Sequence, residues 1–256
     1  MINRHITFLH QTNTKGFAVL IDPDKIDLKN LALLIDKSIK NHVTYFFIGG
    51  SLITENLTSQ IVKLIKTHST IPTILFPGNI SHINLSADGI LYLSLISGRN
   101  PDFLIGQHVI SAPILKKSNL EILSTGYMLI DGGKQTTVSY ISNTTPIPSN
   151  KPDIAICTAM AAEMLGMKLI FMDAGSGAKN AIPFEMISAV RENVELPILV
   201  GGGINTAEKA KNALEAGADI IVVGHGIEND INLIDEIGGV VGSFNLKVQE
   251  KSYFYQ

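Results

Sequence analysis

Residues 197–204, PILVGGGI, are the stretch that decides the fold. A β-branched apolar run stops at three consecutive glycines, Gly201, Gly202 and Gly203, and a helix-like segment follows. Glycine permits positive φ and lets backbone N–H groups approach a ligand closely, and the start of a helix supplies unpaired N–H groups and a positive dipole end. The stretch therefore predicts a phosphate-binding turn. An ordinary tight strand-to-helix turn would use the same glycines, so both interpretations remain open.

A second unit of the same kind follows further along the chain. Residues 220–223, IIVV, end in Gly224 and His225, and another helix-like segment begins there. Two consecutive strand–glycine–helix units late in the chain are typical of the paired phosphate-binding loops of a (β/α)8 barrel. The His225 ring either donates a hydrogen bond to the phosphate or caps the following helix.

The rest of the chain repeats this rhythm of short apolar runs separated by helix-length segments. The apolar runs lie at 17–21, 45–48, 73–76, 90–93, 127–130, 168–172, 197–200 and 220–223, and helical spacing is clearest at 28–41, 56–67, 183–193 and 207–216. Alternating strands and helices imply a parallel sheet, and eight units favour closure over an open sheet. The sequence thus predicts an α/β fold in which residues 1–256 form a single TIM-type (β/α)8 barrel, with phosphate-binding loops at the C-terminal face of the late strands.

Composition narrows the possible functions. The chain has 256 residues, is 45% hydrophobic and only 17% charged, and carries a net charge of −3. A large core can form, and the charge argues against binding nucleic acid by bulk electrostatics. Cys157 is the single cysteine, which rules out an internal disulfide or a thiolate zinc cluster and predicts a buried thiol. With neither a signal-peptide pattern nor a membrane-spanning run, the chain is expected to be cytoplasmic.

Two long connections, 94–125 and 132–166, leave the C-terminal ends of predicted strands, where barrel active sites lie. Long loops in a compact domain are commonly functional or mobile. The end of the chain, 241–256, finishes in SYFYQ and is expected to pack on the barrel, to fray or to reach a partner.

Asp22 stands at the end of the first predicted strand, in IDPDK, where Pro23 makes the corner rigid. An ionised carboxylate repels a phosphorylated substrate unless a cation lies between them, so Asp22 together with phosphate loops predicts Mg²⁺. A turn or helix-capping aspartate is the alternative, and Asp24 is interpreted as such a turn residue. Ser51, in GGS after the second strand, either caps the next helix or places its hydroxyl on the metal or a phosphate.

Residues 171–178, FMDAGSGA, are the most specific single motif. Asp173 ends a strand, and small residues with free N–H groups follow. An acid beside an anion-binding loop suits a hydroxyl nucleophile, because the loop holds the phosphate while the acid takes the proton. A plain turn aspartate is the alternative. Ser176 does not lie in a G-x-S-x-G pattern, which argues against serine hydrolysis. Lys134 is interpreted as a solvated loop lysine, with phosphate binding or Schiff-base chemistry as alternatives.

Taken together and in order, the motifs resemble those of the geranylgeranylglyceryl phosphate synthase family, over about 17–225. They are FAVLIDPDK, YFFIGGS, ILFPGN, LYLSLISGRNPDFLIGQH, GYMLIDGGK, FMDAGSGA, PILVGGGI and VVGH. The chain looks like the second of the two groups of that family, which has bacterial and archaeal members. The resemblance implies a Mg²⁺-dependent prenyltransferase on a TIM-type barrel. Such an enzyme joins C1 of a polyprenyl diphosphate, here expected to be geranylgeranyl diphosphate, to the 3-hydroxyl of sn-glycerol 1-phosphate and releases diphosphate.

The resemblance also implies roles for individual residues. Asp22 and Ser51 would bind Mg²⁺ and through it the prenyl diphosphate, while Asp173 would deprotonate the attacking hydroxyl. Residues 103–115, FLIGQHVISAPIL, would form a wall of the groove for the prenyl chain. The residues implied to hold glycerol phosphate are Phe171, Met172, Asp173, Ala174, Gly175, Ser176, Gly177, Gly201, Gly202, Gly203, Gly224 and His225.

The chain departs from the family pattern at two motifs. The family usually has YLEAGSGA, so Phe171 lacks a hydroxyl and Asp173 is one methylene shorter than the usual Glu. The base must therefore sit closer to the substrate or act through water. His225 replaces the usual Asn, which changes the side-chain contact and its pH dependence. Neither change removes an acid or an anion site, so an active enzyme is expected.

Two other functions remain open from the sequence. One is a different phosphate-gripping barrel enzyme, an isomerase or lyase, which a polar pocket without an apolar groove would favour. The other is a non-catalytic binder of phospholipid precursors. We expect a homo-oligomer, dimeric or hexameric as in the family, with at most transient contact with a membrane surface and no nucleic-acid partner. The sequence does not fix the prenyl chain length.

Overall fold

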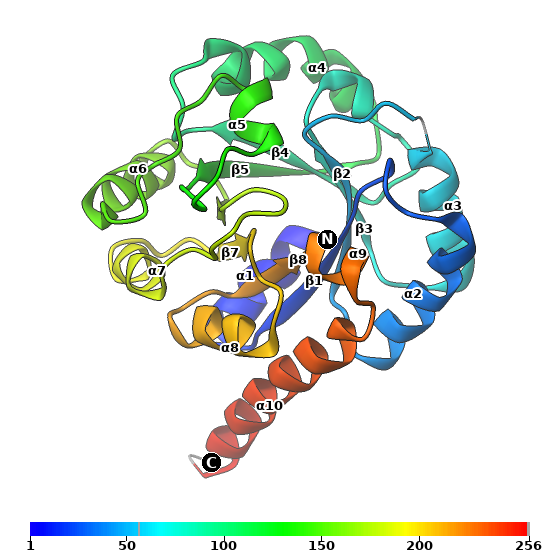
Figure 1. The fold of residues 1–256 in the computed structure, drawn as a ribbon, viewed down its shortest axis with the longest axis vertical. Helices are drawn as coiled ribbons and strands as arrows, with labels where there is room; N and C mark the ends of the chain where they lie inside the picture. Colours follow the sequence, from blue (N-terminus) through cyan, green and yellow to red (C-terminus); the bar gives the residue numbers. More distant parts are fainter. Residues whose placement is uncertain (56, 255–256) are drawn as a thin grey trace.

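The computed structural model describes residues 1–55 and 57–254, with side chains up to Val248, and contains a closed barrel of eight parallel strands (Figure 1). The strands are β1 Gly16–Ile21, β2 Tyr45–Gly50, β3 Thr73–Pro77, β4 Gly89–Leu95, β5 Glu121–Leu129, β6 Leu169–Asp173, β7 Ile198–Gly201 and β8 Ile220–Val223. They are arranged in chain order, and β8 closes the ring by pairing with β1. The predicted α/β barrel is confirmed.

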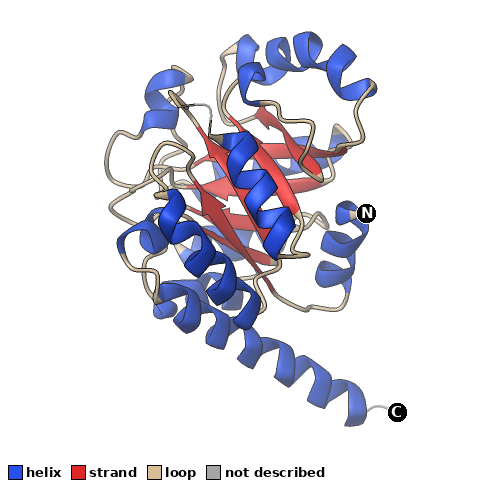
Figure 2. Cartoon of the chain, turned by 90° about the vertical axis from the view of Figure 1, so that its right-hand side faces the viewer, coloured by secondary structure: helices blue, strands red, loops and turns tan. Residues whose placement is uncertain are grey.

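Helices surround the strands on all sides (Figures 1 and 2). They are α1 Ile2–Gln11, α2 Leu28–Lys40, α3 Thr58–His68, α4 Gln107–Lys116, α5 Thr137–Ile141, α6 Pro152–Met164, α7 Phe184–Arg191, α8 Ala207–Glu215, α9 His225–Asn229 and α10 Leu233–Phe254. A short 3-10 helix, Ile80–His82, follows β3, and a π-helical turn, Asp102–Gly106, leads directly into α4. Helix α1 closes the N-terminal end of the barrel, because Ile2, Ile6 and Leu9 pack against its interior side chains.

Strand alternation divides the core into two layers, since successive side chains of a strand point to opposite faces. On β6, Ile170 and Met172 join the layer between strands and helices, whereas Leu169 and Phe171 fill the barrel. The same alternation turns Asp173, the last residue of β6, toward the barrel axis at its C-terminal end. The fold therefore presents this carboxylate where barrel active sites lie.

The strand boundaries match the predictions closely except for β5. The sequence predicts a strand from 127 to 130, but β5 begins at Glu121 because residues 121–127 pair in register with β4. Residues 121–126, EILSTG, are too polar to stand out as a buried run, so only the pairing with β4 reveals this part of β5. The helix predicted from 56 begins at Thr58, and Asn56 itself lies outside the described residues.

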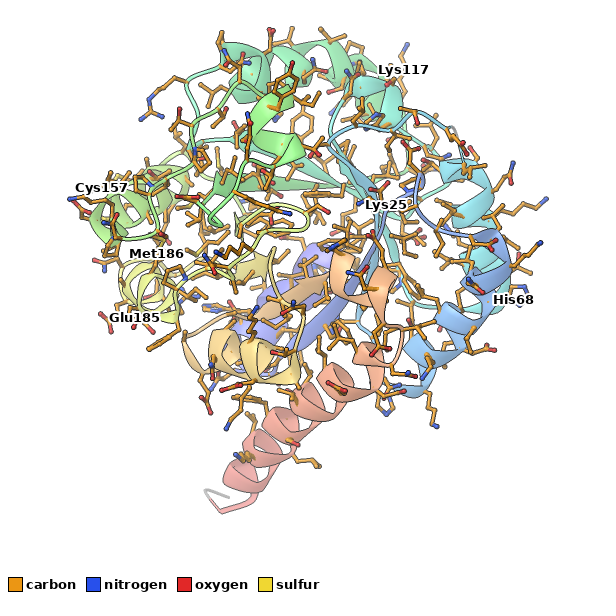
Figure 3. The ribbon with its side chains drawn as sticks, viewed as in Figure 1. Lys25, His68, Lys117, Cys157, Glu185 and Met186 are labelled. Carbon is orange, nitrogen blue, oxygen red and sulfur yellow. The ribbon has the colours of Figure 1, made fainter. Side chains whose placement is uncertain are left out.

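The prediction of a buried thiol is wrong. Cys157 is exposed on α6 and points away from the barrel (Figure 3). Helix α6 is apolar on all sides and buries its alanines, Ala155, Ala159 and Ala162, which leaves Cys157 on the opposite side. Periodicity could not reveal this orientation, because no polar face marks the solvent side.

The two long connections carry helices: the first contains the π-helical turn and α4, and the second contains α5 and α6. The segment 241–254 continues α10, while the last two residues of SYFYQ lie outside the described chain, as do the side chains of the other three. Within the described ranges, no helix has the length and apolar character needed to cross a membrane.

Candidate active site

Asp22 lies at the corner after β1 and is held by two contacts. Its Oδ1 accepts a hydrogen bond from the Asp24 N–H at 3.1 Å, and its Oδ2 pairs with Lys25 Nζ at 3.0 Å. The Asp24 carboxylate instead accepts from the Thr54 N–H and hydroxyl and from the Glu55 N–H, at 2.7 to 2.9 Å. Asp24 therefore fastens the loop after β1 to the loop after β2, which supports its interpretation as a structural residue.

Lys25 is a site residue whose role the sequence analysis missed. Its Nζ lies 3.0 Å from Asp22 Oδ2, 3.5 Å from Glu228 Oε2 and 3.4 Å from Ser176 Oγ, and so links the loop after β1 to α9 and to the loop after β6. Partial burial opposes the charge, but the ion pairs with Asp22 and Glu228 outweigh it and raise the pKa of Lys25. Its position in the same turn as Asp22 was the available signal. Glu228 was also missed, because nothing in the sequence places α9 beside that turn.

The loop after β2 meets Asp22 from the neighbouring strand. Gly49 has φ +147°, and a Cβ there would lie 2.0 Å from the Phe76 carbonyl oxygen, so this position requires glycine. Gly50 lies beside the Asp22 carboxylate, because a Cβ on it would be 3.6 Å from Oδ2. The absence of a side chain at Gly50 leaves that face of the carboxylate open. Ser51 follows directly and lines the same cavity.

These donors fit Mg²⁺ better than a transition metal. Among the described residues, no group of three or more His, Cys, Asp or Glu side chains converges on one point. A zinc site requires such a set, whereas Mg²⁺ is usually bound by one or two carboxylates, with substrate phosphates and water completing its shell. The Asp22 carboxylate and the Ser51 hydroxyl are a donor set of that sparse kind, and they line one cavity.

Asp173 is the buried acid of the site, 7% exposed. Its Oδ2 accepts a hydrogen bond from the Tyr127 hydroxyl at 2.6 Å, and its Oδ1 accepts from the Gly175 N–H at 2.8 Å. Burial raises the pKa of Asp173 above its ordinary value and outweighs the two hydrogen bonds, which act in the opposite direction. The result is a more basic carboxylate than a solvated aspartate, held in one orientation by two donors.

Glycines bring the loops after β6 and β7 together. Gly202 has φ +78°, and a Cβ on it would lie 2.6 Å from Asp173 Oδ1 and from the N atoms of Ala174 and Gly175. Gly203, with φ +69°, approaches the Asn180 carbonyl equally closely. The N–H groups of Ser176, Gly177, Gly202 and Gly203 have no hydrogen-bond partner within the described residues. This concentration of free donors suits a phosphate.

His225 begins α9 and closes the same cavity. Its Nδ1 lies 3.1 Å from Glu228 Oε2 and its Nε2 lies 3.2 Å from Asn229 Nδ2, so both contacts are within its own helix. A Cβ on Gly177 would lie 3.6 Å from His225 Cδ2 and 3.6 Å from Lys134 Nζ. Lys134 therefore reaches the loop after β6 while remaining exposed, which agrees with its interpretation as a solvated loop lysine.

The polar cavity, which is partly open to solvent, brings together most of the predicted site residues. Those that line it are Asp22, Ser51, Phe171, Asp173, Ser176, Gly177, Gly201, Gly202, Gly203, Gly224 and His225.

Three of the residues predicted to hold phosphate have other positions. The side chains of Met172 and Ala174 point into the outer core layer, because they alternate with Phe171 and Asp173, and they do not line the polar cavity. The Gly175 N–H donates a hydrogen bond to Asp173 Oδ1 and is therefore already paired. The Phe171 ring reaches the cavity but is 1% exposed, so it forms an apolar floor and not a phosphate contact.

An apolar cavity, partly open to solvent, adjoins the polar one. Its apolar and aromatic lining includes Phe76, Ile80, Ile83, Leu91, Tyr92, Leu93, Leu95, Phe103, Tyr127, Val138 and Ile141. Of the predicted wall 103–115, the residues Phe103, Gln107, His108 and Ser111 face the cavity, whereas Ile105, Val109 and Ile110 face solvent.

The two cavities meet along a seam. Gly50, Ser51, Phe76 and Val138 line both of them. Tyr127 faces the apolar cavity, Asp173 faces the polar one, and the hydrogen bond between these two side chains crosses from one to the other. The buried acid therefore lies where an apolar ligand and a phosphorylated ligand would meet.

Comparison with known proteins places this geometry in context. The PcrB family model matches residues 10–241. The chain is 56% identical to the geranylgeranylglyceryl phosphate synthase of Spirosoma linguale over 91% of its length and 94% of the relative's. It is 60% identical to the synthase of the same name from Chitinophaga pinensis, over 89% and 90%. The crystal structure of (S)-3-O-geranylgeranylglyceryl phosphate synthase from Thermoplasma acidophilum, in complex with its substrate sn-glycerol-1-phosphate, matches with a TM-score of 0.88 and 27% identity, over 96% of this chain and 98% of that one.

Proposed function

This chain belongs to the PcrB family, and we propose that it is a prenyltransferase that joins a polyprenyl diphosphate to the 3-hydroxyl of sn-glycerol 1-phosphate. The observation that carries the proposal is the seam between the two cavities, where the Asp173 carboxylate is buried. One substrate is a hydrocarbon chain with a charged head, and the other is small and polar. Their reacting atoms must meet where an apolar and a polar cavity join.

The polar cavity provides the binding of glycerol phosphate. The free N–H groups of Ser176, Gly177, Gly202 and Gly203 bind the phosphate, and the start of α8 lies just beyond them. With its phosphate held there, the glycerol moiety extends toward the seam. The 3-hydroxyl then lies within reach of Asp173, and the apolar cavity keeps C1 of the prenyl chain at the same place.

Asp173 acts as the general base. The oxygen of the 3-hydroxyl attacks C1 and gives its proton to the carboxylate, while the bond from C1 to the diphosphate oxygen breaks and diphosphate leaves with the electron pair. Both carboxylate oxygens already accept one hydrogen bond, yet each retains a second lone pair. Tyr127 and Gly175 therefore fix the orientation of the base without occupying it fully. Mg²⁺ held by Asp22 and Ser51 would neutralise the charge on the departing diphosphate.

The apolar cavity weighs against an isomerase or lyase that acts on a small phosphorylated metabolite. Such an enzyme needs a polar pocket alone, whereas here β3, β4 and β5 line a second, mainly apolar cavity beside the polar one. A non-catalytic binder would use the same cavities, so turnover has to distinguish it from an enzyme.

The test is turnover of radiolabelled sn-glycerol 1-phosphate with farnesyl, geranylgeranyl and longer diphosphates, each with Mg²⁺ and with EDTA. We expect ether product that requires the metal and that falls by about 100-fold or more in Asp173→Asn, since a general base contributes that much. Asp22→Asn should be comparably impaired. Asp36→Asn, on the exposed side of α2, is the matched control and should keep full activity.

Product from none of the donors, despite binding of glycerol phosphate, would contradict the transferase and favour a binder. The preferred donor would supply the prenyl length. Assembly as a dimer or hexamer, a cytoplasmic location and transient membrane contact remain predictions, and light scattering on the purified protein tests the first of them.

A further inference from the structure

Lys25 has no part in the reaction as described, yet it touches both halves of the polar cavity. We propose that Lys25 is the resident counter-ion of the Asp22 carboxylate, that Mg²⁺ displaces it from there, and that the displaced ammonium then binds the phosphate groups of the substrates. This inference rests on the proposed function, because it assigns the cavity to a metal and two phosphorylated ligands.

The contacts of Lys25 come from three different loops. Asp22 belongs to the loop after β1, Ser176 to the loop after β6 and Glu228 to α9, and all three have atoms within 3.5 Å of Nζ. Ser176 adjoins the free N–H groups assigned to glycerol phosphate, and Asp22 is assigned to the metal and diphosphate. The ammonium therefore stands between the two predicted anion sites.

Charge explains why a cation is needed in the cavity before any ligand arrives. Asp22 and Glu228 both face it, and with no cation near them they would repel each other and any phosphate. His225 contacts Glu228 from within α9, and Lys134 approaches Gly177 on the far side, but within the described part of the chain neither forms an ion pair with Asp22. Lys25 is the cation that neutralises Asp22 in the ligand-free protein.

A divalent ion on the Asp22 carboxylate changes this balance. The ammonium, now about 3 Å from Oδ2, would share the carboxylate with a stronger cation and be repelled by it. Its flexible four-carbon stem lets it move without moving the backbone, and Glu228 and Ser176 remain as partners on the other side. That movement directs Nζ toward the space between the phosphates, where a charge-assisted hydrogen bond replaces the lost ion pair.

A purely structural role is a poor explanation for these contacts. The Lys25 side chain is 44% exposed, and exposed ion pairs contribute little to stability. Lys25→Met should therefore fold with an unchanged Tm, which keeps the test interpretable.

The experiment measures two affinities for which the proposal predicts opposite changes. Mn²⁺, the probe for the metal site, is titrated into the ligand-free protein, and the bound fraction is quantified by electron paramagnetic resonance. Inorganic pyrophosphate, the probe for the anion site, is then titrated calorimetrically with Mn²⁺ present. The variants are Lys25→Met and Lys25→Arg. Asp22→Asn serves as a reference for the metal site, and Lys63→Met, an exposed lysine of α3, is the matched control.

In Lys25→Met we expect Mn²⁺ to bind about threefold tighter or more, because a competing cation is gone. Pyrophosphate should bind about tenfold weaker or more, because a charge-assisted hydrogen bond is lost. Lys25→Arg should keep pyrophosphate affinity close to that of the unmodified protein, and Lys63→Met should change neither affinity. A merely structural residue would not move the two affinities in opposite directions.

Unchanged or weaker Mn²⁺ binding in Lys25→Met, or unchanged pyrophosphate binding, would overturn the proposal for Lys25. Such a result for Lys25 leaves the proposed function intact, provided that Asp22→Asn loses Mn²⁺ binding and the unmodified protein forms ether product. If Asp22→Asn binds Mn²⁺ normally, the metal site itself is misplaced, and the inference about Lys25 falls with it.

Discussion

The two halves of the barrel mouth are built in different ways. After β6, β7 and β8, the cavity is lined by glycine-rich turns, with Gly177, Gly202, Gly203 and Gly224 among its walls. On the side of β3, β4 and β5, the apolar cavity is lined by side chains of strands and helices, such as Leu93. The connections after β4 and β5 are long enough to carry α4 and α5.

The difference reflects what each ligand requires. A phosphate is bound by N–H groups, which every residue except proline possesses, provided that no Cβ blocks the approach. A hydrocarbon chain is bound by buried apolar area, which only large side chains supply. The polar half is therefore sensitive to the addition of a single methyl group, whereas the apolar half is sensitive to its removal.

Among the substitutions that test this difference between the two halves, Gly202→Ala should have the largest effect. The new Cβ would lie 2.6 Å from two backbone nitrogen atoms and from Asp173, none of which can move without displacing the loop after β6. We expect affinity for glycerol phosphate to fall by about 100-fold, which corresponds to losing two hydrogen bonds to a charged group. Calorimetric titration of glycerol phosphate measures this.

Gly166→Ala is the matched control for that change. Gly166 has the same φ of +78°, but a Cβ on it meets nothing within 4 Å. The substitution should cost about 1–2 kcal/mol of unfolding free energy, from the left-handed backbone alone, and leave binding intact. Equal loss of binding in both variants would mean that backbone strain, and not the close approach of the loops, explains the glycine.

Phe103→Ala tests the apolar half and should have the second-largest effect. Phe103 lines the apolar cavity from the π-helical turn, so its removal takes away buried area that a prenyl chain would contact. We expect the KM for the prenyl diphosphate to rise about tenfold, with the KM for glycerol phosphate unchanged. Ile105→Ala, in the same turn but 59% exposed, should alter neither constant. A rise in both constants would show that the two halves are not independent.

Tyr127→Phe tests the seam between the halves. The tyrosine hydroxyl stabilises the charged form of Asp173, so its removal raises the pKa of that carboxyl further above its ordinary value. Because the base must be ionised, activity is lost as pH falls through that pKa. We expect the acid limb of the kcat/KM profile to move to higher pH. An acid limb that stays in place or moves to lower pH would argue against Asp173 as the base.

Gly239→Ala should have the smallest effect. Gly239 lies in α10 with nothing within 4 Å of its would-be Cβ and without positive φ, so it has neither of the constraints that act on Gly202. Alanine should raise the unfolding free energy by about 1 kcal/mol, since glycine is the poorer helix former, without changing turnover. Thermal unfolding measures it, and destabilisation would contradict the open surroundings of Gly239.

The outline of the site was predictable because it follows the covalent order of the chain. Asp173 is the last residue of its strand, and Asp22, Ser51, Gly202 and His225 lie within two residues after the end of theirs. In a closed parallel barrel, all such positions gather at one end. Eight apolar runs, most of them followed by glycine or aspartate, therefore indicated both the fold and the residues at its mouth.

Contacts between loops were not predictable, since they depend on packing at distances that periodicity does not encode. The sequence places Lys25 beside Asp22, but only the closed barrel brings Glu228 within 3.5 Å of its ammonium. In the same way, Tyr127 reaches Asp173 because β5 and β6 are neighbours and both side chains point inward.

The sequence by itself determined the repeat of strand and helix, the glycines that permit phosphate-binding loops and the acid at the end of β6. These depend on local backbone conformation and on the alternation of apolar residues, which are properties of short segments. Only the tertiary structure decided that Met172 faces away from the cavity, that Cys157 is exposed and that the polar and apolar cavities share a seam at Asp173. These depend on which faces of separate elements pack together, and burial at that level is a property of the closed barrel and not of any one segment.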